Sequence, residues 1–143
     1  VSQPVESELP LRDCLADWRA EAQERLDGTG VALSWQQGDI ITDQVSVFFT
    51  RHMARVLREC INNVIRHAGA SLIRITLEEE GGQLALTLED NGQAGDPRAW
   101  RPGQGTRNIH HRVARLGGTV VWQATVEGGC LIRMSVALEE GQG

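Results

Sequence analysis

The chain contains no lysine, and all 14 of its basic residues are arginine. Any cationic contact to a phosphate must therefore come from a guanidinium group, which can bind it in a bidentate fork. No run of about 18 apolar residues is present either, so the sequence predicts no membrane-spanning segment. Acidic residues outnumber basic ones and the net charge is −5, which argues against nucleic acid as a partner.

Cysteines and targeting signals are also scarce. Cys14, Cys60 and Cys130 lie far apart and form no C-x-x-C pair, so we expect neither disulfides nor a zinc site, and a reducing cytoplasm fits. The N-terminus is polar and acidic, with neither a signal peptide nor an initiator methionine. We expect a cytoplasmic piece of a longer protein that makes no membrane contact of its own, even where the parent chain is membrane-anchored.

Apolar residues recur with helix and strand periods along the 143 residues, a length that suits one domain. Helical periods cover 11–26, about 43–67 and 109–116. Strand alternation covers 31–35 and two expected hairpins, 73–77 with 84–88 and 120–126 with 132–138. This order predicts an α+β fold, a two-layer sandwich with helices on one face of a mixed sheet. Residues 1–10 are expected to be a flexible lead-in, and 89–105 a long loop that is functional or mobile.

The end of the second expected helix carries polar groups that a solvated helix face does not need. Glu59, Asn63, Arg66 and His67 bring an acid, an amide, a guanidinium and an imidazole together in RECINNVIRHAGA (58–70). Asn63 offers an amide oxygen, a ligand type that Mg²⁺ prefers. Taken alone, Glu59 is better explained as a surface acid, and His67 equally well as a terminal residue favoured by the helix dipole.

Two glycine-containing motifs follow. EDNGQAG (89–95) places Asp90 at a strand end, where its carboxylate can accept a hydrogen bond from an adenine amine, and Gly92 where the backbone can approach the base. GQG (103–105) opens the helix after the loop, whose N-terminal N–H groups can bind phosphate. Each motif alone is a weak signal, but their order and the long loop between the last two are typical of a nucleotide site.

Together these motifs resemble the catalytic ATP-binding domain of sensor histidine kinases, within the GHKL ATPase superfamily. RECINNVIRHAGA resembles the N box of kinases that pair with LuxR/NarL-type response regulators. EDNGQAG resembles the G1 box, GQGTRNIHHRVARLGG the G2 box with its helix, and VEGGCLIRMSVAL the closing glycine-rich hairpin. The resemblance covers about Arg51 to Leu138 and implies a Bergerat-type ATP-binding fold.

The resemblance also implies roles for particular residues. Asn63 would be the Mg²⁺ ligand, Asp90 the adenine acceptor and Gly92 the floor of the base pocket. Glu59 would hold a water molecule or orient Asn63. The implied catalytic set is Glu59, Asn63, Arg66 and His67, with the last two near the phosphates. The implied ATP-binding set is Asn63, Asp90, Gly92, Gly95, Gly103, Gly105 and Thr106, with Gly103 and Gly105 as the hinge of a lid.

Three positions depart from the family pattern. Ala94 stands where a second G1 glycine is usual, with Gly95 displaced by one residue. Thr106 replaces an apolar residue, and Cys130 replaces a threonine whose hydroxyl can reach the base through water. We expect these changes to affect nucleotide affinity and lid closure more than the fold.

The implied function is a protein-histidine kinase that binds Mg-ATP and donates the γ-phosphate to a histidine of a dimerisation domain outside this chain, in two-component signalling with a LuxR/NarL-type response regulator. The isolated domain is expected to be monomeric. None of its four histidines is followed by an acid, so we expect no autophosphorylation without that dimerisation domain. Two alternatives stay open: an anti-sigma-factor serine kinase of the same fold, and a nucleotide-binding docking module that has lost catalysis.

Overall fold

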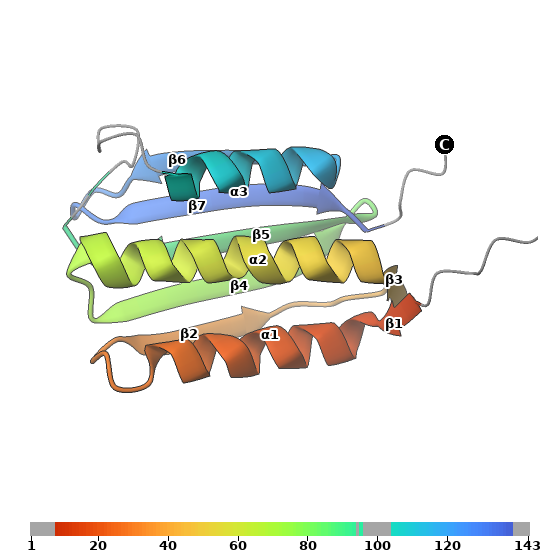
Figure 1. Cartoon of the computed structure of the whole chain (residues 1–143), viewed down its shortest axis with the longest axis horizontal. Coiled ribbons are helices and arrows are strands. Elements are labelled where there is room, and N and C mark those ends of the chain that lie inside the picture. The colour runs from red at the N-terminus through yellow and green to blue at the C-terminus, as the bar shows by residue number, and fades with distance from the viewer. Residues whose placement is uncertain (1–7, 94, 96–103, 139–143) are drawn as a thin grey trace, which may run out of the picture.

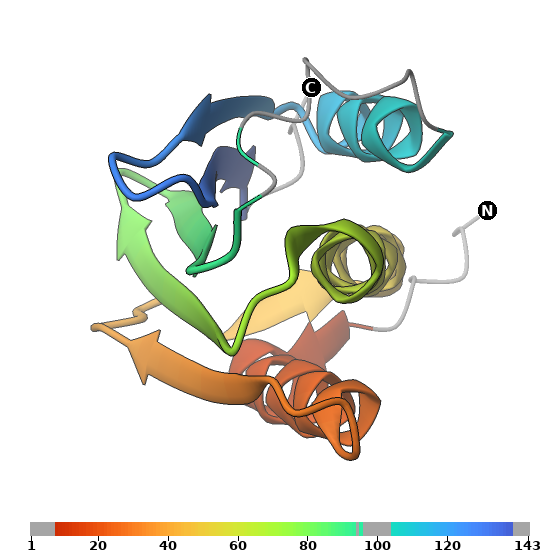
Figure 2. The same ribbon diagram turned by 90° about the vertical axis from the view of Figure 1, so that its left-hand side faces the viewer.

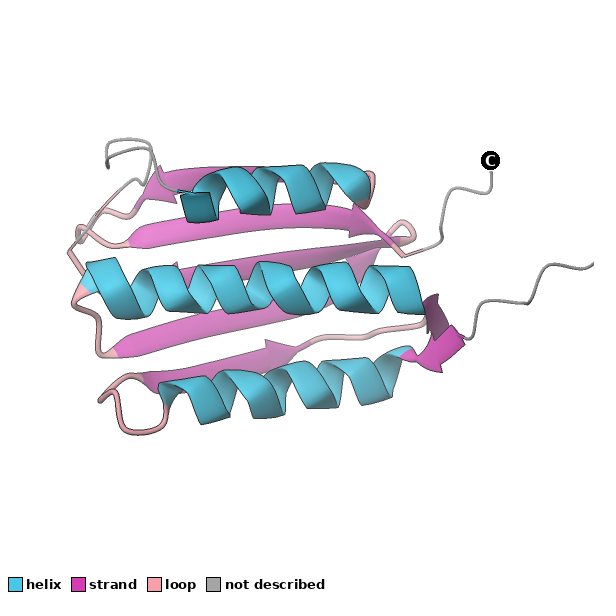
Figure 3. Ribbon diagram, viewed as in Figure 1, coloured by secondary structure: helices cyan, strands magenta, loops and turns pink. Residues whose placement is uncertain are grey.

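The helical periods of the sequence produce three α-helices in the part of the chain that the computed structural model describes, residues 8–93, 95 and 104–138. They are α1 (Leu11–Leu26), α2 (Val47–Asn63) and α3 (Gln104–Arg115). All three lie on one face of the main sheet (Figures 1 and 3), with their buried side chains in one core. The expected two-layer α+β sandwich is therefore confirmed. None of the described helices has the length and apolar character needed to span a bilayer.

The main sheet is mixed, as expected. Its strands are β2 (Ala32–Gln37), β4 (Leu72–Glu80), β5 (Gln83–Asp90), β6 (Thr119–Ala124) and β7 (Cys130–Ala137). Their order is β2-β4-β5-β7-β6, with β2 parallel to β4 and all other neighbours antiparallel. Both predicted hairpins are confirmed. The β4–β5 turn uses Gly81 and Gly82 at φ 58° and 78°, as a two-residue hairpin turn requires.

Alternation along the strands fills the core between the two layers. Every second residue of β4, β5 and β7 points to the helices, and the aliphatic side chains and methionine among them are Ile73, Ile75, Leu77, Leu84, Leu86, Leu88, Ile132, Met134 and Val136. They belong to one buried cluster with Phe49, Met53 and Val56 of α2. Each large aliphatic side chain buried in this way contributes about 1.5–3 kcal/mol, so α2 is held firmly over the centre of the sheet.

Two short strands correct the expected boundaries near the N-terminus. β1 (Glu8–Pro10) pairs antiparallel with β3 (Gln44–Ser46), so the last three residues of the expected flexible lead-in are part of a sheet. Residues 1–7 lie outside the described part of the chain. The long helix begins at Val47 rather than near residue 43, because the Ser46 hydroxyl accepts the Phe49 N–H at 3.0 Å and caps the helix there. β2 also runs on to Gln37, two residues beyond the strand alternation expected at 31–35.

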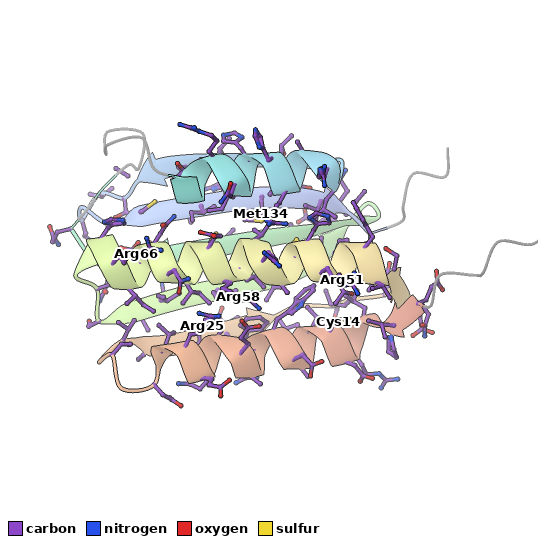
Figure 4. All side chains as sticks on the ribbon, viewed as in Figure 1. Cys14, Arg25, Arg51, Arg58, Arg66 and Met134 are labelled. Atoms are coloured by element: carbon purple, nitrogen blue, oxygen red, sulfur yellow. The ribbon has the colours of Figure 1, made fainter. Side chains whose placement is uncertain are left out.

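Polar contacts join α1 to α2 on the outer side of the helical layer. The Glu21 carboxylate accepts hydrogen bonds from Arg25 at 3.0 Å and from Arg58 at 2.8 Å. These donors, Arg58 first, hold the pKa of Glu21 below its ordinary value, although burial acts to raise it. Figure 4 shows Arg25 and Arg58 side by side between the two helices. About a third of each side chain is exposed, so these pairs add little to stability, and only the Arg58 pair joins α2 to α1.

Candidate functional site

Four segments converge at one end of the molecule. The C-terminal end of α2, the end of β5, the β6–β7 turn and the start of α3 all lie at the left of Figure 1, and Figure 2 looks onto that end. The described part of the chain buries only two polar residues, Asn63 at 9% exposure and Asp90 at 4%. Both belong to these segments. Burial of a polar group without a structural partner is costly, so each needs a physical explanation.

Asp90 ends β5, the middle strand of the sheet. Its Oδ1 accepts the Gly92 N–H at 2.8 Å, and its carboxylate also accepts the Cys130 N–H. Burial raises the pKa of Asp90 above its ordinary value, and these two N–H groups and the neighbouring Glu89 charge are smaller influences. Within the described residues Asp90 forms no ion pair. The site therefore holds a buried carboxyl group that has acceptor capacity left and no cation beside it.

The β6–β7 turn reaches Asp90 because it ends in two glycines. A Cβ on Gly129 would lie 2.1 Å from the Asp90 carbonyl oxygen, and one on Gly128, at φ 99°, would lie 2.8 Å from Oε1 of Gln93. The Gly128 carbonyl also accepts the Gly95 N–H at 2.9 Å. Sequence reasoning recognised the glycine-rich hairpin but missed these two residues as parts of the site. The adjacent glycines just before a strand were the available signal.

Asn91 fixes the other side of the same strand end. Its Oδ1 accepts the N–H groups of Ser71 at 2.8 Å and Leu72 at 2.9 Å, and its Nδ2 donates to the Ser71 hydroxyl at 2.9 Å. The start of β4 is thereby tied to the end of β5. Sequence reasoning also missed this positioning residue, because an Asp-Asn-Gly triplet predicts only a turn.

The polar end of α2 differs from the expected continuous α-helix. The α-helix ends at Asn63, and Val64–Ala68 form a π-helical turn that stops at Gly69, with φ 64°. Single π-turns of this kind are frequent at functional sites. Asn63 is buried at 9% exposure, and its amide takes part in no hydrogen bond within the described residues. Its oxygen is therefore available to a ligand.

The structure separates the remaining expected residues of the N-box segment. Glu59 is half-buried one turn before Asn63, so the two share a face of α2. Arg66 and His67 are exposed on the π-turn, and Figure 4 shows Arg66 at the end of α2. They lie at the correct end of the molecule but outside the buried part of the site.

The glycine positions after Asp90 are partly described. Gly92 is buried and Gly95 has φ 71°. Ala94 and Gly103 lie outside the described residues. α3 begins at Gln104, so Gly105 is inside its first turn and does not precede it as expected; Thr106 follows, half-buried, in the same turn. The hinge role that the resemblance implies for Gly103 and Gly105 stays a prediction.

The family model for the histidine kinase-, DNA gyrase B-, and HSP90-like ATPase matches residues 50–140. The chain is 35% identical over 98 residues to the sensor histidine kinase MctS of Rhizobium johnstonii. The aligned region covers 65% of the chain and 21% of that protein. It is 30% identical over 93 residues to the nitrate/nitrite sensor protein NarQ of Escherichia coli, covering 64% of the chain and 16% of that protein. The chain thus spans less than a quarter of the length of these relatives.

Solved structures show the same fold. The histidine kinase domain from the Erythrobacter litoralis EL346 blue-light activated histidine kinase superposes with a TM-score of 0.76 at 19% identity, over 96% of this chain and 66% of that one. The catalytic domain of the histidine kinase ThkA superposes with a TM-score of 0.74 at 14% identity, over 92% of this chain and 96% of that one. At these identities the likeness concerns the fold alone.

The raised pKa of Asp90 predicts a pH-dependent cost of burying it. Between the ordinary pKa and the raised one, the carboxyl group of Asp90 keeps its proton in the folded chain and has lost it in the unfolded chain. The contribution of Asp90 to stability is therefore present below its ordinary pKa and is lost as pH rises through the raised value. Asp90→Asn removes the charge and keeps an oxygen for the Gly92 N–H. We expect the free energy of unfolding of the variant, relative to wild type, to increase as pH rises from about 4 to about 7.

Urea unfolding at a series of pH values measures this difference. Asp17→Asn, which removes an exposed acid from α1, is the matched control for the loss of one negative charge. A constant or decreasing relative stability of Asp90→Asn over the same range would contradict the interpretation.

Proposed function

The chain belongs to the histidine kinase-, DNA gyrase B-, and HSP90-like ATPase family, and on this premise we propose that it is the catalytic domain of a protein-histidine kinase. It binds Mg-ATP and presents the γ-phosphate to a histidine of a separate dimerisation domain, in a parent protein that pairs with a LuxR/NarL-type response regulator. The observation that carries this proposal is that Asn63 and Asp90 are the two buried polar residues of the described chain and lie at one end of it.

Asp90 fits a neutral hydrogen-bond donor better than a cation. Its carboxylate is buried and oriented by the N–H groups of Gly92 and Cys130, and an amine N–H of adenine would take up its remaining acceptor capacity. Gly129 brings β7 close enough for the Cys130 N–H to take part. Cys130 itself is buried, and its thiol replaces the hydroxyl that the family pattern has at this position.

Asn63 fits a hard cation that arrives with its phosphates. Within the described residues no three or more His, Cys, Asp or Glu side chains gather into a metal cage. Mg²⁺ keeps several waters and prefers oxygen, so one amide oxygen is a sufficient protein ligand. When bound, it would neutralise phosphate charge, which phosphoryl transfer requires. Glu59, on the same face of α2, would orient Asn63, and the exposed guanidinium of Arg66 would reach the phosphates.

The phosphoacceptor has to come from outside this chain. The four histidines, His52, His67, His110 and His111, are followed by Met, Ala, His and Arg, so no acid is positioned next to them to take a ring proton. His52 Nδ1 lies 3.3 Å from the Arg112 guanidinium. The neighbour of this imidazole is therefore a cation, which cannot take a ring proton as an acid side chain would. The serine-kinase alternative shares the fold, but the similar curated proteins reported above are sensors, which favours a histidine acceptor.

Asp90→Asn tests base recognition. Loss of a hydrogen bond to a charged acceptor costs about 1.5–3 kcal/mol, so ADP should bind about tenfold to a hundredfold more weakly. Calorimetric titration measures the affinity, and circular dichroism checks that the variant is folded. Asp17→Asn should bind ADP like wild type. Unchanged ADP affinity in a folded Asp90→Asn variant would refute the role of Asp90.

Asn63→Ala tests the metal site, with its neighbour Asn62 as a matched control. Removal of the proposed protein ligand should weaken ADP binding in excess Mg²⁺ by about tenfold or more and leave adenosine binding unchanged. Asn62→Ala removes an amide that accepts from Arg25 at 3.5 Å and should affect neither ligand. Equal losses for adenosine and Mg-ADP in Asn63→Ala would make Asn63 a structural residue.

Phosphoryl transfer is tested with ATP labelled on the γ-phosphate. The isolated chain should acquire no acid-labile, alkali-stable label, because none of its histidines has an adjacent acid. Addition of the dimerisation domain of the parent kinase should place such label on that domain, and Asp90→Asn should prevent it. Acid-labile label on the isolated chain would contradict the proposed division of roles.

A further inference from the structure

Positive charge is concentrated on α2, the π-turn and α3 of an acidic protein. α2, the π-turn and α3 carry half of the 14 arginines but only one of the 19 acids, Glu59. These arginines are Arg51, Arg55, Arg58, Arg66, Arg107, Arg112 and Arg115. In the part of the chain that the structure describes, Arg58 is the only one of them that forms an ion pair, with Glu21.

A hollow of about 420 Å³ lies among these charges, between α2 and α3. We call it the α2–α3 notch; its lining residues are His52, Asn108, His111, Arg112, Ala114 and Arg115. Because α2 and α3 run antiparallel in Figure 1, the first half of α2 lies beside the last half of α3. The notch is therefore at the opposite end of the helical layer from Asn63, and Figure 4 shows Arg51 near that end of α2.

A hydrogen bond between α2 and α3 holds the wall of the notch. The Arg112 guanidinium donates to His52 Nδ1 at 3.3 Å, which requires a neutral imidazole. Burial lowers the pKa of His52, and the charges of Arg112, Arg115 and Arg55 lower it further. His52 thus positions a guanidinium without adding charge. None of the groups that shift the pKa of His52 is an acid, and neither Arg112 nor Arg115 forms an ion pair within the described part of the chain.

An apolar side chain borders the charged wall. Phe48 lies one helical turn before His52, and the two ring centroids are 4.3 Å apart. Phe48 is 42% exposed, although it belongs to the strongly amphipathic α2. An exposed aromatic ring beside unpaired arginines is the combination that protein interfaces favour at their centres.

We propose that the α2–α3 notch binds an acidic protein segment, with carboxylates on Arg112 and Arg115 and an apolar side chain against Phe48. Guanidinium groups bind carboxylates in bidentate pairs, and the missing negative charge makes the notch complementary to such a segment. The small volume of the notch suits side chains. An extended polyanion such as nucleic acid, or a membrane surface, would also meet the rest of the chain, which carries all but one of its acids.

Fluorescence anisotropy with a synthetic probe tests this proposal. The probe is a short fluorescein-labelled helical peptide with glutamates spaced four apart and one leucine, used in about 0.1 M salt. Arg112→Ala with Arg115→Ala should weaken its binding by about tenfold, as the loss of two charged bidentate contacts predicts. The matched control, Arg12→Ala with Arg19→Ala, removes the same charge from exposed sites on α1 and should change binding less than about twofold.

Further arms separate the partner classes. Phe48→Ala should weaken binding of the leucine peptide but not of the same peptide with alanine in its place. Absence of peptide binding by wild type, or equal losses in both double variants, would overturn the proposal. The proposal would also be overturned if single-stranded DNA or anionic phospholipid vesicles bound more tightly than the peptide and lost affinity in the Arg112→Ala, Arg115→Ala variant. ADP titration of every variant should be unchanged, so failure of nucleotide binding in wild type would affect the proposed function and leave this inference standing.

Discussion

A carboxyl group buried at the end of the middle strand constrains the geometry of this end of the molecule. Asp90 lies on a strand with neighbours on both sides. On one side, Asn91 ties the end of β5 to the start of β4. On the other side, Gly129 lets the start of β7 approach within hydrogen-bonding distance of Asp90. A side chain at position 129 would collide with the backbone of Asp90. The acceptor is therefore positioned by the hydrogen-bonded sheet itself, which is the most rigid support that the fold offers.

The second half of the site depends on how α2 ends. The change from α-helix to π-turn after Asn63 leaves that amide buried and carries Arg66 and His67 into solvent. The two halves thus differ in character: a buried carboxyl on the sheet suits a fixed, uncharged donor, and a buried amide beside exposed basic groups suits a hydrated cation and its phosphates. This difference supports assigning the base to Asp90 and the metal to Asn63, rather than the reverse.

Much of the fold was predictable because burial of one face gives helices and strands a regular spacing of apolar residues, which is visible in the sequence. The helix at 11–26 and both hairpins follow from spacing alone. The spacing did not predict β1 and β3, because three-residue strands are too short to show alternation. The π-turn was missed because the apolar stripe runs unbroken through Val64. Asn91 and Gly129 act through contacts with segments that are distant in sequence, and no local pattern encodes such contacts.

The same distance in sequence explains why the α2–α3 notch has no linear signature. Arg112 and His52 are 60 positions apart and meet only because α2 and α3 pack antiparallel. Near the end of α3, Arg112 and Arg115 also offset the negative end of the helix dipole, a local reason for their presence. That reason does not apply to Arg51 and Arg55, which lie beyond the first turn of α2 and well before its last turn. The helix dipole therefore accounts for the arginines at the end of α3 but not for those of α2 beside them, and the proposed acidic partner of the α2–α3 notch would account for both.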